Sequence, residues 1–432
     1  MRSALRIQLQ EYGAPVECEK EQMDLIALSR ANERWMRTLG LGTDPIQVED
    51  LRDGRLRLRA AAVTGVVRVG DTDIEIAPKF LNATAGSWQT VLWRVLAVVE
   101  GGHLDENLTS GEDLKTLSLP DLLAQIFLDS YTKGAARGLP RSYRAEDSAG
   151  SVLRGAFDTA RIGQWIARPW DIPYVVDLLT DDTEIARLLR WSAECLASTV
   201  KSPGRSRALR EVVGMLSHAG RRPPHLQDAQ RIALGIQHQG LEPARLVGVL
   251  MLEGAGVHHA QGEHALSGFL WKSDVIYENY VYWLCQRAAV RIKGSVRKST
   301  VGFGEVISGV GSRLTTTPDV LFTDDWGVPV AVADSKYKRF GTRPKAPDTY
   351  QVLTAAHVLG CRRVSLTYPV DRWVEPTVWR VASGLGGADV EMTALPLNLM
   401  ALANPEGAAV LVDSICRWLN AELFGDISVD CK

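Results

Sequence analysis

The sequence of 432 residues lacks several features that would assign it to a specialised class. It has no apolar run of about 18 residues and no apolar core near its start, which argues against a membrane span and a signal peptide. Its six cysteines are scattered without a C-x-x-C pair, which argues against a zinc ribbon or a disulfide scaffold. No P-loop pattern is present. We therefore expect a cytoplasmic protein without membrane contact and without a P-loop nucleotide site of its own.

The composition is that of a globular protein, with 46% hydrophobic and 23% charged residues. The length is enough for about two or three domains. The net charge of -2 gives no sign of a nucleic-acid binder, but residues 287–345 contain 11 Lys or Arg against 5 Asp or Glu. This local excess is compatible with a surface that faces phosphate groups, and equally with a solvated charged face.

The first part of the chain reads as β-rich. Residues 54–60 alternate basic and apolar side chains, as a half-buried strand does, and residues 65–80 read as two strands around a turn at Gly70 and Asp71. Helices are expected over residues 87–100 and 119–133. The polar stretch 137–162 is expected to form a long exposed hairpin or loop.

A second helical region and a compact final region follow. The sequence from Asp182 to Glu184 is a helix-capping signal, and residues 256–268 read as a linker. From Ser273 the expected order is helix, strands, helix, strand, which indicates a mixed α/β core. We predict two domains, a β-rich and helical one at residues 1–240 and a mixed α/β one at residues 241–432.

Charged residues in an apolar hairpin are the most informative feature of the chain. In the expected strand after the turn at residues 324–327, Asp334 and Lys336 share a face with Val332. The simplest register puts Asp319 opposite Val332, which makes it a diagonal neighbour of Asp334 at roughly 7–8 Å. Two carboxylates at that range can share a divalent cation, and without one they repel each other. Lys336 could then neutralise charge on an attacking water or on a phosphate.

A third carboxylate is a candidate member of the same site. Glu278 lies at helical spacing with Val281, Cys285 and Ala289, so it is expected to face inward, where a free carboxylate is costly. A nearby metal ion or lysine would explain its position. A purely structural ion-pair hairpin is the alternative explanation for the whole cluster.

This constellation resembles the PD-(D/E)-x-K nuclease core. Pro318 and Asp319 are separated by 14 residues from the D-x-K triplet that ends at Lys336, a helix with Glu278 precedes them and a helix with Gln351 follows. The resemblance implies that Asp319 and Asp334 bind Mg²⁺, for which Mn²⁺ can substitute, and that Glu278 supports the metal or the water. It also implies that Lys336 is the catalytic lysine and that Gln351 is auxiliary.

The chain as a whole resembles the McrC family, the nuclease subunit of modification-dependent restriction systems. The similarity runs from about Leu56 to Pro369 and includes the segments 73–80, 137–143, 153–158 and 178–192. It implies that the N-terminal region docks into the pore of a ring of McrB-like AAA+ GTPase subunits and stimulates their hydrolysis. It further implies that the C-terminal region cuts double-stranded DNA, possibly modified DNA. The basic loops with Arg141, Arg144 and Arg154 would then point at the ring.

Other interpretations have less support. The glycines of residues 301–312 lack the flanking strand and helix of a dinucleotide-binding loop. His258, His259 and His264 lie in the expected linker without a helix that carries a carboxylate, so a metal site there is disfavoured. A second function stays open, that of a catalytically silent assembly and regulatory subunit of an AAA+ motor that retains the nuclease fold.

Overall fold

The structure is a computed structural model that describes residues 5–51, 53–69, 72–81, 88–99, 118–136, 138–253, 257–259, 266–304, 307, 314–341, 343–382, 389–404 and 406–420. Within these ranges, no helix has the length and apolar character that crossing a membrane requires. The described cysteines form no disulfide.

The chain forms two compact units, and the first is discontinuous. It combines Met1–Leu122 with Gly254–Lys432, whereas the second consists of Leu123–Glu253. Residues 256–268 were predicted as a linker, and that prediction was wrong. Strand pairing in this region explains why the first unit is discontinuous. The region contains β10 (Val257–His259) and β11 (Leu266–Lys272), and β11 pairs with β5 (Val63–Val69) in a single sheet. The two domains at residues 1–240 and 241–432 stay a prediction. The two compact units have their boundaries at other residues.

The N-terminal sheet has five strands in the order β1-β6-β5-β11-β10. At Gly65 the backbone has a φ of 141°, and a Cβ atom there would lie 2.2 Å from the carbonyl oxygen of Phe269 on β11. Only glycine allows this close approach of the two strands. The predicted strands at 65–80 are confirmed, while their turn at Gly70 and Asp71 lies outside the described residues. The remaining bounds are β1 (Leu5–Gln10) and β6 (Thr72–Ala77).

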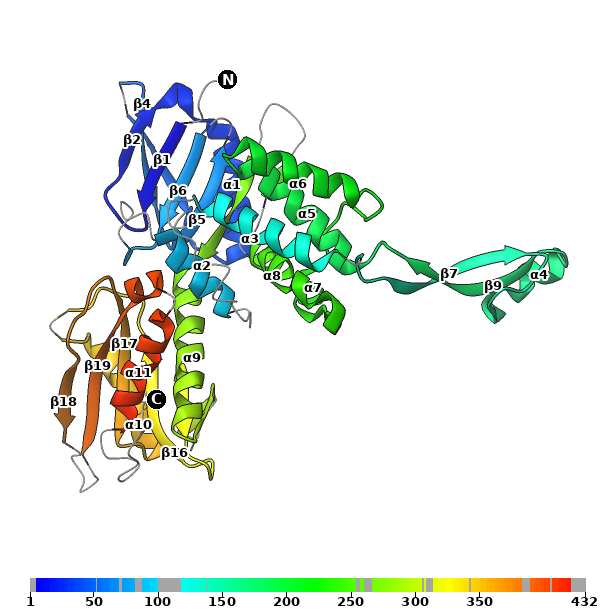
Figure 1. The fold of residues 1–432 in the computed structure, drawn as a ribbon. Coiled ribbons are helices and arrows are strands. Elements are labelled where there is room, and N and C mark those ends of the chain that lie inside the picture. Colours follow the sequence, from blue (N-terminus) through cyan, green and yellow to red (C-terminus); the bar gives the residue numbers. More distant parts are fainter. Residues whose placement is uncertain are drawn as a thin grey trace. The chain divides into compact units, whose positions relative to one another are not determined.

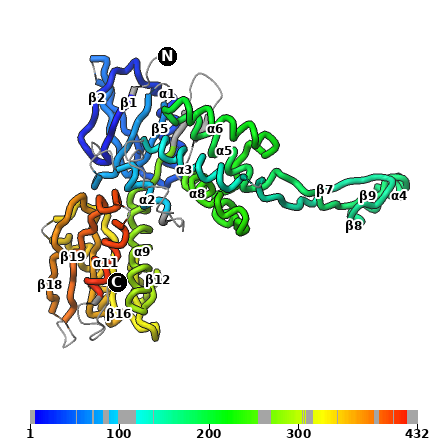
Figure 2. Tube along the Cα trace, viewed as in Figure 1, coloured from blue at the N-terminus to red at the C-terminus, as the bar shows by residue number. Residues whose placement is uncertain are grey.

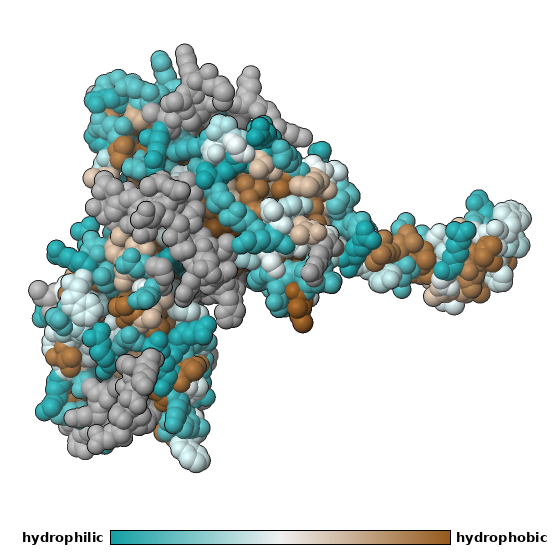
Figure 3. All heavy atoms as spheres, in the orientation of Figure 1, coloured by the Kyte–Doolittle hydropathy of each residue, from teal (hydrophilic) through white to brown (hydrophobic). Residues whose placement is uncertain are grey.

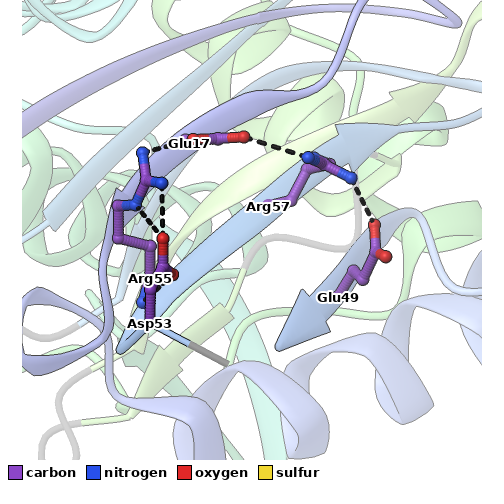
Figure 4. Close-up of polar contacts among 5 residues, drawn as sticks. All are labelled: Glu17, Glu49, Asp53, Arg55 and Arg57. Atoms are coloured by element: carbon purple, nitrogen blue, oxygen red, sulfur yellow. Dashed lines mark hydrogen bonds and ion pairs between the residues drawn. The ribbon is translucent and has the colours of Figure 1, made fainter. Parts of the chain in front are cut away.

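A three-stranded sheet and one helix share the hydrophobic core of this five-stranded sheet. The helix is α1 (Leu25–Leu39), and the strand order is β2-β4-β3. The predicted alternation is confirmed in β4, whose apolar side chains are buried. Its polar face carries cross-strand ion pairs, in which Arg57 contacts both Glu17 and Glu49 while Arg55 contacts Glu17 and Asp53 (Figure 4). The bounds are β2 (Val16–Glu19), β3 (Ile46–Asp50) and β4 (Arg55–Ala60).

The C-terminal sheet is mixed, as predicted. Its order is β12-β15-β16-β17-β19-β18; β16, β17 and β19 run parallel, and the other pairings are antiparallel. Helix α10 packs on one face through an apolar core that includes Val332, Val352 and Val364 (Figure 1). The strands are β12 (Ser295–Arg297), β15 (Val320–Thr323), β16 (Pro329–Ser335), β17 (Arg363–Val370), β18 (Thr377–Val381) and β19 (Val390–Asn398); the helices are α2 (Trp88–Val99), α9 (Ser273–Arg291), α10 (Ala346–Leu359) and α11 (Gly407–Asn420).

The second unit is a helical body with a long arm. Thr183 caps α5 through a hydrogen bond from the backbone N–H of Ala186, as the capping signal predicts. An exposed hairpin or loop was predicted for residues 137–162; the arm is a hairpin that continues to Thr180, and its strands β7 and β9 pair along their whole length (Figures 1 and 2). The bounds are α3 (Leu119–Gly134), α5 (Glu184–Thr199), α6 (Pro203–Met215), α7 (Leu226–Arg231) and α8 (Glu242–Glu253), with β7 (Ser142–Gly150), β8 (Ala156–Phe157), α4 (Ile162–Ala167) and β9 (Ile172–Thr180) in the arm.

A buried polar cluster joins the two large sheets of the first unit. The Tyr337 hydroxyl, just beyond β16, donates to Oε2 of Glu11 at 2.5 Å, and the backbone N–H of Lys79 donates to the same oxygen at 3.2 Å. The Lys79 ammonium donates to the carbonyl oxygen of Tyr337 at 2.6 Å and lies 3.9 Å from the centre of its ring. Burial raises the pKa of Glu11, and contacts with Tyr337 and Lys79 offset part of that rise.

We predict that Tyr337→Phe destabilises the protein by about 1–3 kcal/mol, because it removes a hydrogen-bond donor from a buried carboxylate. Thermal unfolding followed by calorimetry would measure the effect. Tyr143→Phe is the matched control, since the Tyr143 side chain lies on the arm and is 73% exposed. Equal unfolding temperatures for the two variants would show that the cluster does not hold the sheets together.

Candidate functional site

The turn of the β15–β16 hairpin is as predicted, but its register is not. The backbone N–H of Gly327 donates to the carbonyl oxygen of Asp324, which closes the turn. Val332 pairs with Leu321, so the prediction that Asp319 faces Val332 was wrong by two residues. An extra residue on β16, Val330, accounts for part of the shift, because such a bulge changes the pairing of every later residue.

The corrected register brings Asp319 closer to Asp334 than predicted. Val320 pairs with Ala333, so Asp319 stands just before β15 at the level of Asp334. Its Oδ2 accepts a hydrogen bond of 2.7 Å from the backbone N–H of Ser335. Burial, and then the charges of Asp334 and Glu278, raise the pKa of Asp319 to about 6. The strand thus places two carboxylates side by side in a partly desolvated position.

Asp334, Lys336 and Gln351 meet in one cluster, in which Asp334 is buried, Lys336 half-buried and Gln351 exposed. Asp334 is only 1% exposed, and its Oδ2 forms an ion pair with the Lys336 ammonium. The Gln351 amide contacts both partners, since Nε2 donates to Oδ1 of Asp334 at 3.3 Å and Oε1 accepts from Nζ of Lys336 at 3.1 Å. Burial raises the pKa of Asp334, although the lysine acts in the opposite direction. The structure therefore brings together three of the predicted site residues.

Asp348 is a fourth member, which the sequence interpretation missed. It is buried, accepts from the Lys338 ammonium at 2.8 Å through both oxygens and lies 3.8 Å from Nζ of Lys336. It precedes Gln351 by one helical turn on α10, so the two side chains share a face. That spacing was visible in the sequence and could have identified it.

Glu278 does not face inward, and that prediction was wrong. Val281, Cys285 and Ala289 are buried as expected, but the Glu278 side chain is 38% exposed and forms an ion pair of 2.7 Å with Lys298. It stands at the edge of the apolar stripe of α9, where the carboxylate reaches solvent. Its charge still contributes to the raised pKa values of the two aspartates.

The paired aspartates suit a hard divalent cation. Both offer carboxylate oxygens as ligands, and burial disfavours their charged forms. A cation between them would relieve their repulsion. Among the described residues, however, no three His, Cys, Asp or Glu side chains stand close enough to form a complete metal site. The ligand set of Asp319, Asp334 and Glu278 therefore stays a prediction.

The other sequence motifs do not form a second site within the described residues. His258 and His259 lie on β10, and His264 lies outside the described part of the chain. The glycine-rich stretch begins with β13 (Val301–Gly304), which pairs with β14 (Leu314–Thr316) as a short hairpin and not as a strand leading into a helix.

The raised pKa of Asp319 predicts a pH-dependent cost in stability. The folded protein holds this proton more tightly than the unfolded chain does, so its stability should fall as the pH rises from about 4 to 6. We expect Asp319→Asn to remove that fall and to stabilise the metal-free protein above pH 6 by about 1–2 kcal/mol, allowing for solvent screening. Urea unfolding in EDTA across this pH range measures it. Asp371→Asn, at an exposed position, is the control, and parallel profiles for both variants would contradict the prediction.

Comparisons with known proteins show the fold and the family. The fold is similar to that in the half-complex from the tetradecameric assembly of Thermococcus gammatolerans McrB AAA+ hexamers with bound McrC. The TM-score is 0.60 at 14% identity, over 96% of this chain and 99% of the other. The cryo-EM structure of the Thermococcus gammatolerans McrBC complex gives a TM-score of 0.43 at 15% identity, over 66% and 88%, and adds no argument. No curated protein matches the sequence.

The sequence itself matches one family. Residues 58–369, which include Asp319, Asp334, Lys336 and Gln351, match the model of the McrBC 5-methylcytosine restriction system component. The match extends over more than half of the chain and covers parts of both compact units. The chain therefore belongs to the McrBC 5-methylcytosine restriction system component family.

Proposed function

We propose that the chain is the nuclease subunit of a cytoplasmic McrBC-type restriction complex. It hydrolyses phosphodiester bonds of double-stranded DNA with Mg²⁺ in a PD-(D/E)-x-K site, and it docks on an McrB-like AAA+ GTPase ring whose hydrolysis it stimulates. The observation that carries the proposal is the Asp334–Lys336–Gln351 cluster beside Asp319, with Asp334 itself buried. Family membership supports the proposal, and the fold similarity is consistent with it.

The burial of Asp334, with Asp319 half-buried beside it, favours catalysis over a structural ion pair. A surface ion pair contributes little to stability, and a buried one recovers its desolvation penalty only with excellent geometry. Here two aspartates with raised pKa values lie together, and one lysine forms an ion pair with Asp334. Perturbed carboxylates of this kind are concentrated at functional sites.

Each residue has a distinct proposed role. Asp319 and Asp334 would hold Mg²⁺ or Mn²⁺, with Glu278 as a supporting carboxylate, and the bound ion would supply Lewis-acid activation of a phosphate oxygen and a water. Lys336 places its ammonium where it can neutralise charge that develops on the phosphate. Gln351 holds that ammonium at 3.1 Å and so fixes its direction.

The arm of the second unit is the element that we propose for docking on the ring. Its far end exposes apolar side chains, and hydrophobic and hydrophilic residues alternate along it (Figure 3). Exposed apolar groups on a protruding element mark interaction surfaces. Arg154 is exposed in the turn that leads to β8, whereas Arg141 forms an ion pair of 2.6 Å with Asp181 at the base. The exposed apolar residues of the far end are Val152, Leu153, Ile162, Trp165, Ile166 and Trp170.

One observation favours the alternative, a catalytically silent subunit that only regulates the motor. Glu278 is engaged by Lys298, and Lys336 is engaged by Asp334, so the described residues form no complete metal site. A silent subunit would stimulate the partner GTPase without cutting DNA under any condition. The intact Asp334–Lys336 pair favours the nuclease, because nothing in a regulatory role requires it.

We predict that Lys336→Ala lowers cleavage at least about 100-fold, since it removes the charge that stabilises the transition state. Plasmid cleavage with Mg²⁺ or Mn²⁺ and an McrB-like GTPase measures this, on modified and unmodified DNA. Lys20→Ala, which breaks an exposed ion pair with Asp50, is the control. GTPase stimulation by the Lys336 variant should stay at the wild-type level. Cleavage by this variant at the wild-type rate would contradict the nuclease site, and stimulation without cleavage by wild type would favour the silent subunit.

We predict that Trp170→Ala on the arm weakens stimulation of the GTPase ring at least several-fold, because an exposed aromatic anchor is lost from the contact. The steady-state GTPase rate, titrated with each variant, measures this. Trp326→Ala is the matched control, since Trp326 is 88% exposed on the β15–β16 turn and Trp170 is 71% exposed on the arm. Equal stimulation by both variants would remove the arm from the docking surface.

A further inference from the structure

A small basic cavity lies beside the candidate site, between the end of β16 and the start of α10. Its volume is about 130 Å³, which is room for about four waters. Four cationic residues line it, and Asp348 and Tyr368 complete the polar lining. The four cations are Lys338, Arg339, Arg343 and Lys345.

Most of the positive charge around this cavity is not neutralised. Asp348 accepts from Lys338, but Arg339, Arg343 and Lys345 form no ion pair with any described residue and are exposed. Residues 336–345 contain five Lys or Arg and no Asp or Glu, in a chain whose net charge is -2. The cavity is therefore a local source of positive potential that suits an anion.

A buried hydroxyl group in the lining gives a second, independent sign of a ligand. Tyr368 is 4% exposed, and its Oη forms no hydrogen bond with any described residue. Its ring packs edge-on against Phe340, with ring centres 5.4 Å apart. A buried hydroxyl without a partner is costly, and a phosphate oxygen at this position would accept its hydrogen bond.

The cavity adjoins the candidate catalytic cluster through Asp348. This residue lines the cavity, accepts from the ammonium of Lys338 at 2.8 Å and lies 3.8 Å from the ammonium of Lys336. An anion in the cavity would therefore be a near neighbour of a phosphate bound at Lys336, as the phosphates of one polynucleotide strand are.

We propose that this basic cavity is a subsite for the DNA backbone, which binds a phosphate next to the one that is cut. The subsite rests on the proposed nuclease function and adds to it the residues that position the strand. Arg339, Arg343 and Lys345 attract the backbone, and the Tyr368 hydroxyl donates to a phosphate oxygen. The contacts are to the backbone alone, so the subsite carries no base specificity.

The test measures duplex binding by the full-length chain in EDTA, where cleavage cannot occur. The double variant Arg339→Glu, Arg343→Glu is compared with Arg362→Glu, Arg380→Glu, which reverses the same charge at exposed positions near the opposite end of β17. Fluorescence anisotropy with a labelled duplex is followed from about 50 to 200 mM salt. We expect the first variant to bind at least about 10-fold more weakly and the salt slope to fall by about one to two. The control should bind like wild type.

Tyr368→Phe provides a milder variant that keeps the packed ring. We expect about 3- to 10-fold weaker duplex binding at every salt concentration with an unchanged salt slope, because no charge is removed. A change in slope for this variant would contradict the assigned hydrogen bond.

The remaining outcomes decide whether the basic cavity is a subsite for the DNA backbone. No duplex binding by wild type at low salt, or equal binding by the two double variants, would overturn the subsite. So would weaker binding of inorganic phosphate by the first double variant with duplex binding unchanged, since the cavity would then hold a small anion only. If wild type never cleaves DNA but the charge-reversal effect is present, the subsite stands and the nuclease proposal fails. If wild type cleaves DNA while all variants bind the duplex equally, the nuclease proposal stands and the subsite fails.

Discussion

A polar cluster of Glu11, Lys79 and Tyr337 links the N-terminal sheet to the end of the strand that carries the candidate site. Tyr337 directly follows Lys336, whose backbone N–H donates to the carbonyl oxygen of Thr367 on β17. The chain at this point is thus held from one side by its own sheet and from the other by Glu11 and Lys79. The Lys336 side chain is anchored by a backbone that has little freedom to shift, which is what a positioned catalytic group requires.

Three carboxylates of the first unit lie against a cation. The Lys336 ammonium pairs with Asp334, the Lys338 ammonium pairs with Asp348, and Lys79 lies against the Glu11–Tyr337 pair. Asp319 differs, since a backbone N–H is its hydrogen-bond donor and its pKa is raised to about 6. Stability and the proposed function therefore conflict at Asp319, because a proposed cation ligand is a poorly compensated carboxylate while no cation is bound.

Local sequence patterns predicted individual helices and strands, but they did not predict contacts between residues that are far apart in the sequence. Alternation identified β4, the capping signal identified the start of α5, and the D-x-K triplet with its following helix identified the Asp334–Lys336–Gln351 cluster. The prediction of the hairpin register was wrong in part because one bulged residue changes every later pairing. The predicted direction of Glu278 was wrong because Glu278 stands at the edge of an apolar stripe. The pairing of β11 with β5 joins residues about 200 apart in the sequence, and local sequence periodicity cannot predict such a contact.

The pairing of β11 with β5 also sets an order for folding during synthesis. The N-terminal sheet has β1, β6 and β5 once residue 77 has been made, but one edge of β5 stays unpaired until residues 266–272 follow. The whole second unit is synthesised in between and can fold first, because its contacts are internal. The nascent chain thus carries an open strand edge from residue 77 until residue 272 has been made, and such edges pair with other chains. Gly65, on that edge, admits the close approach of β11, which a residue with a Cβ atom would block.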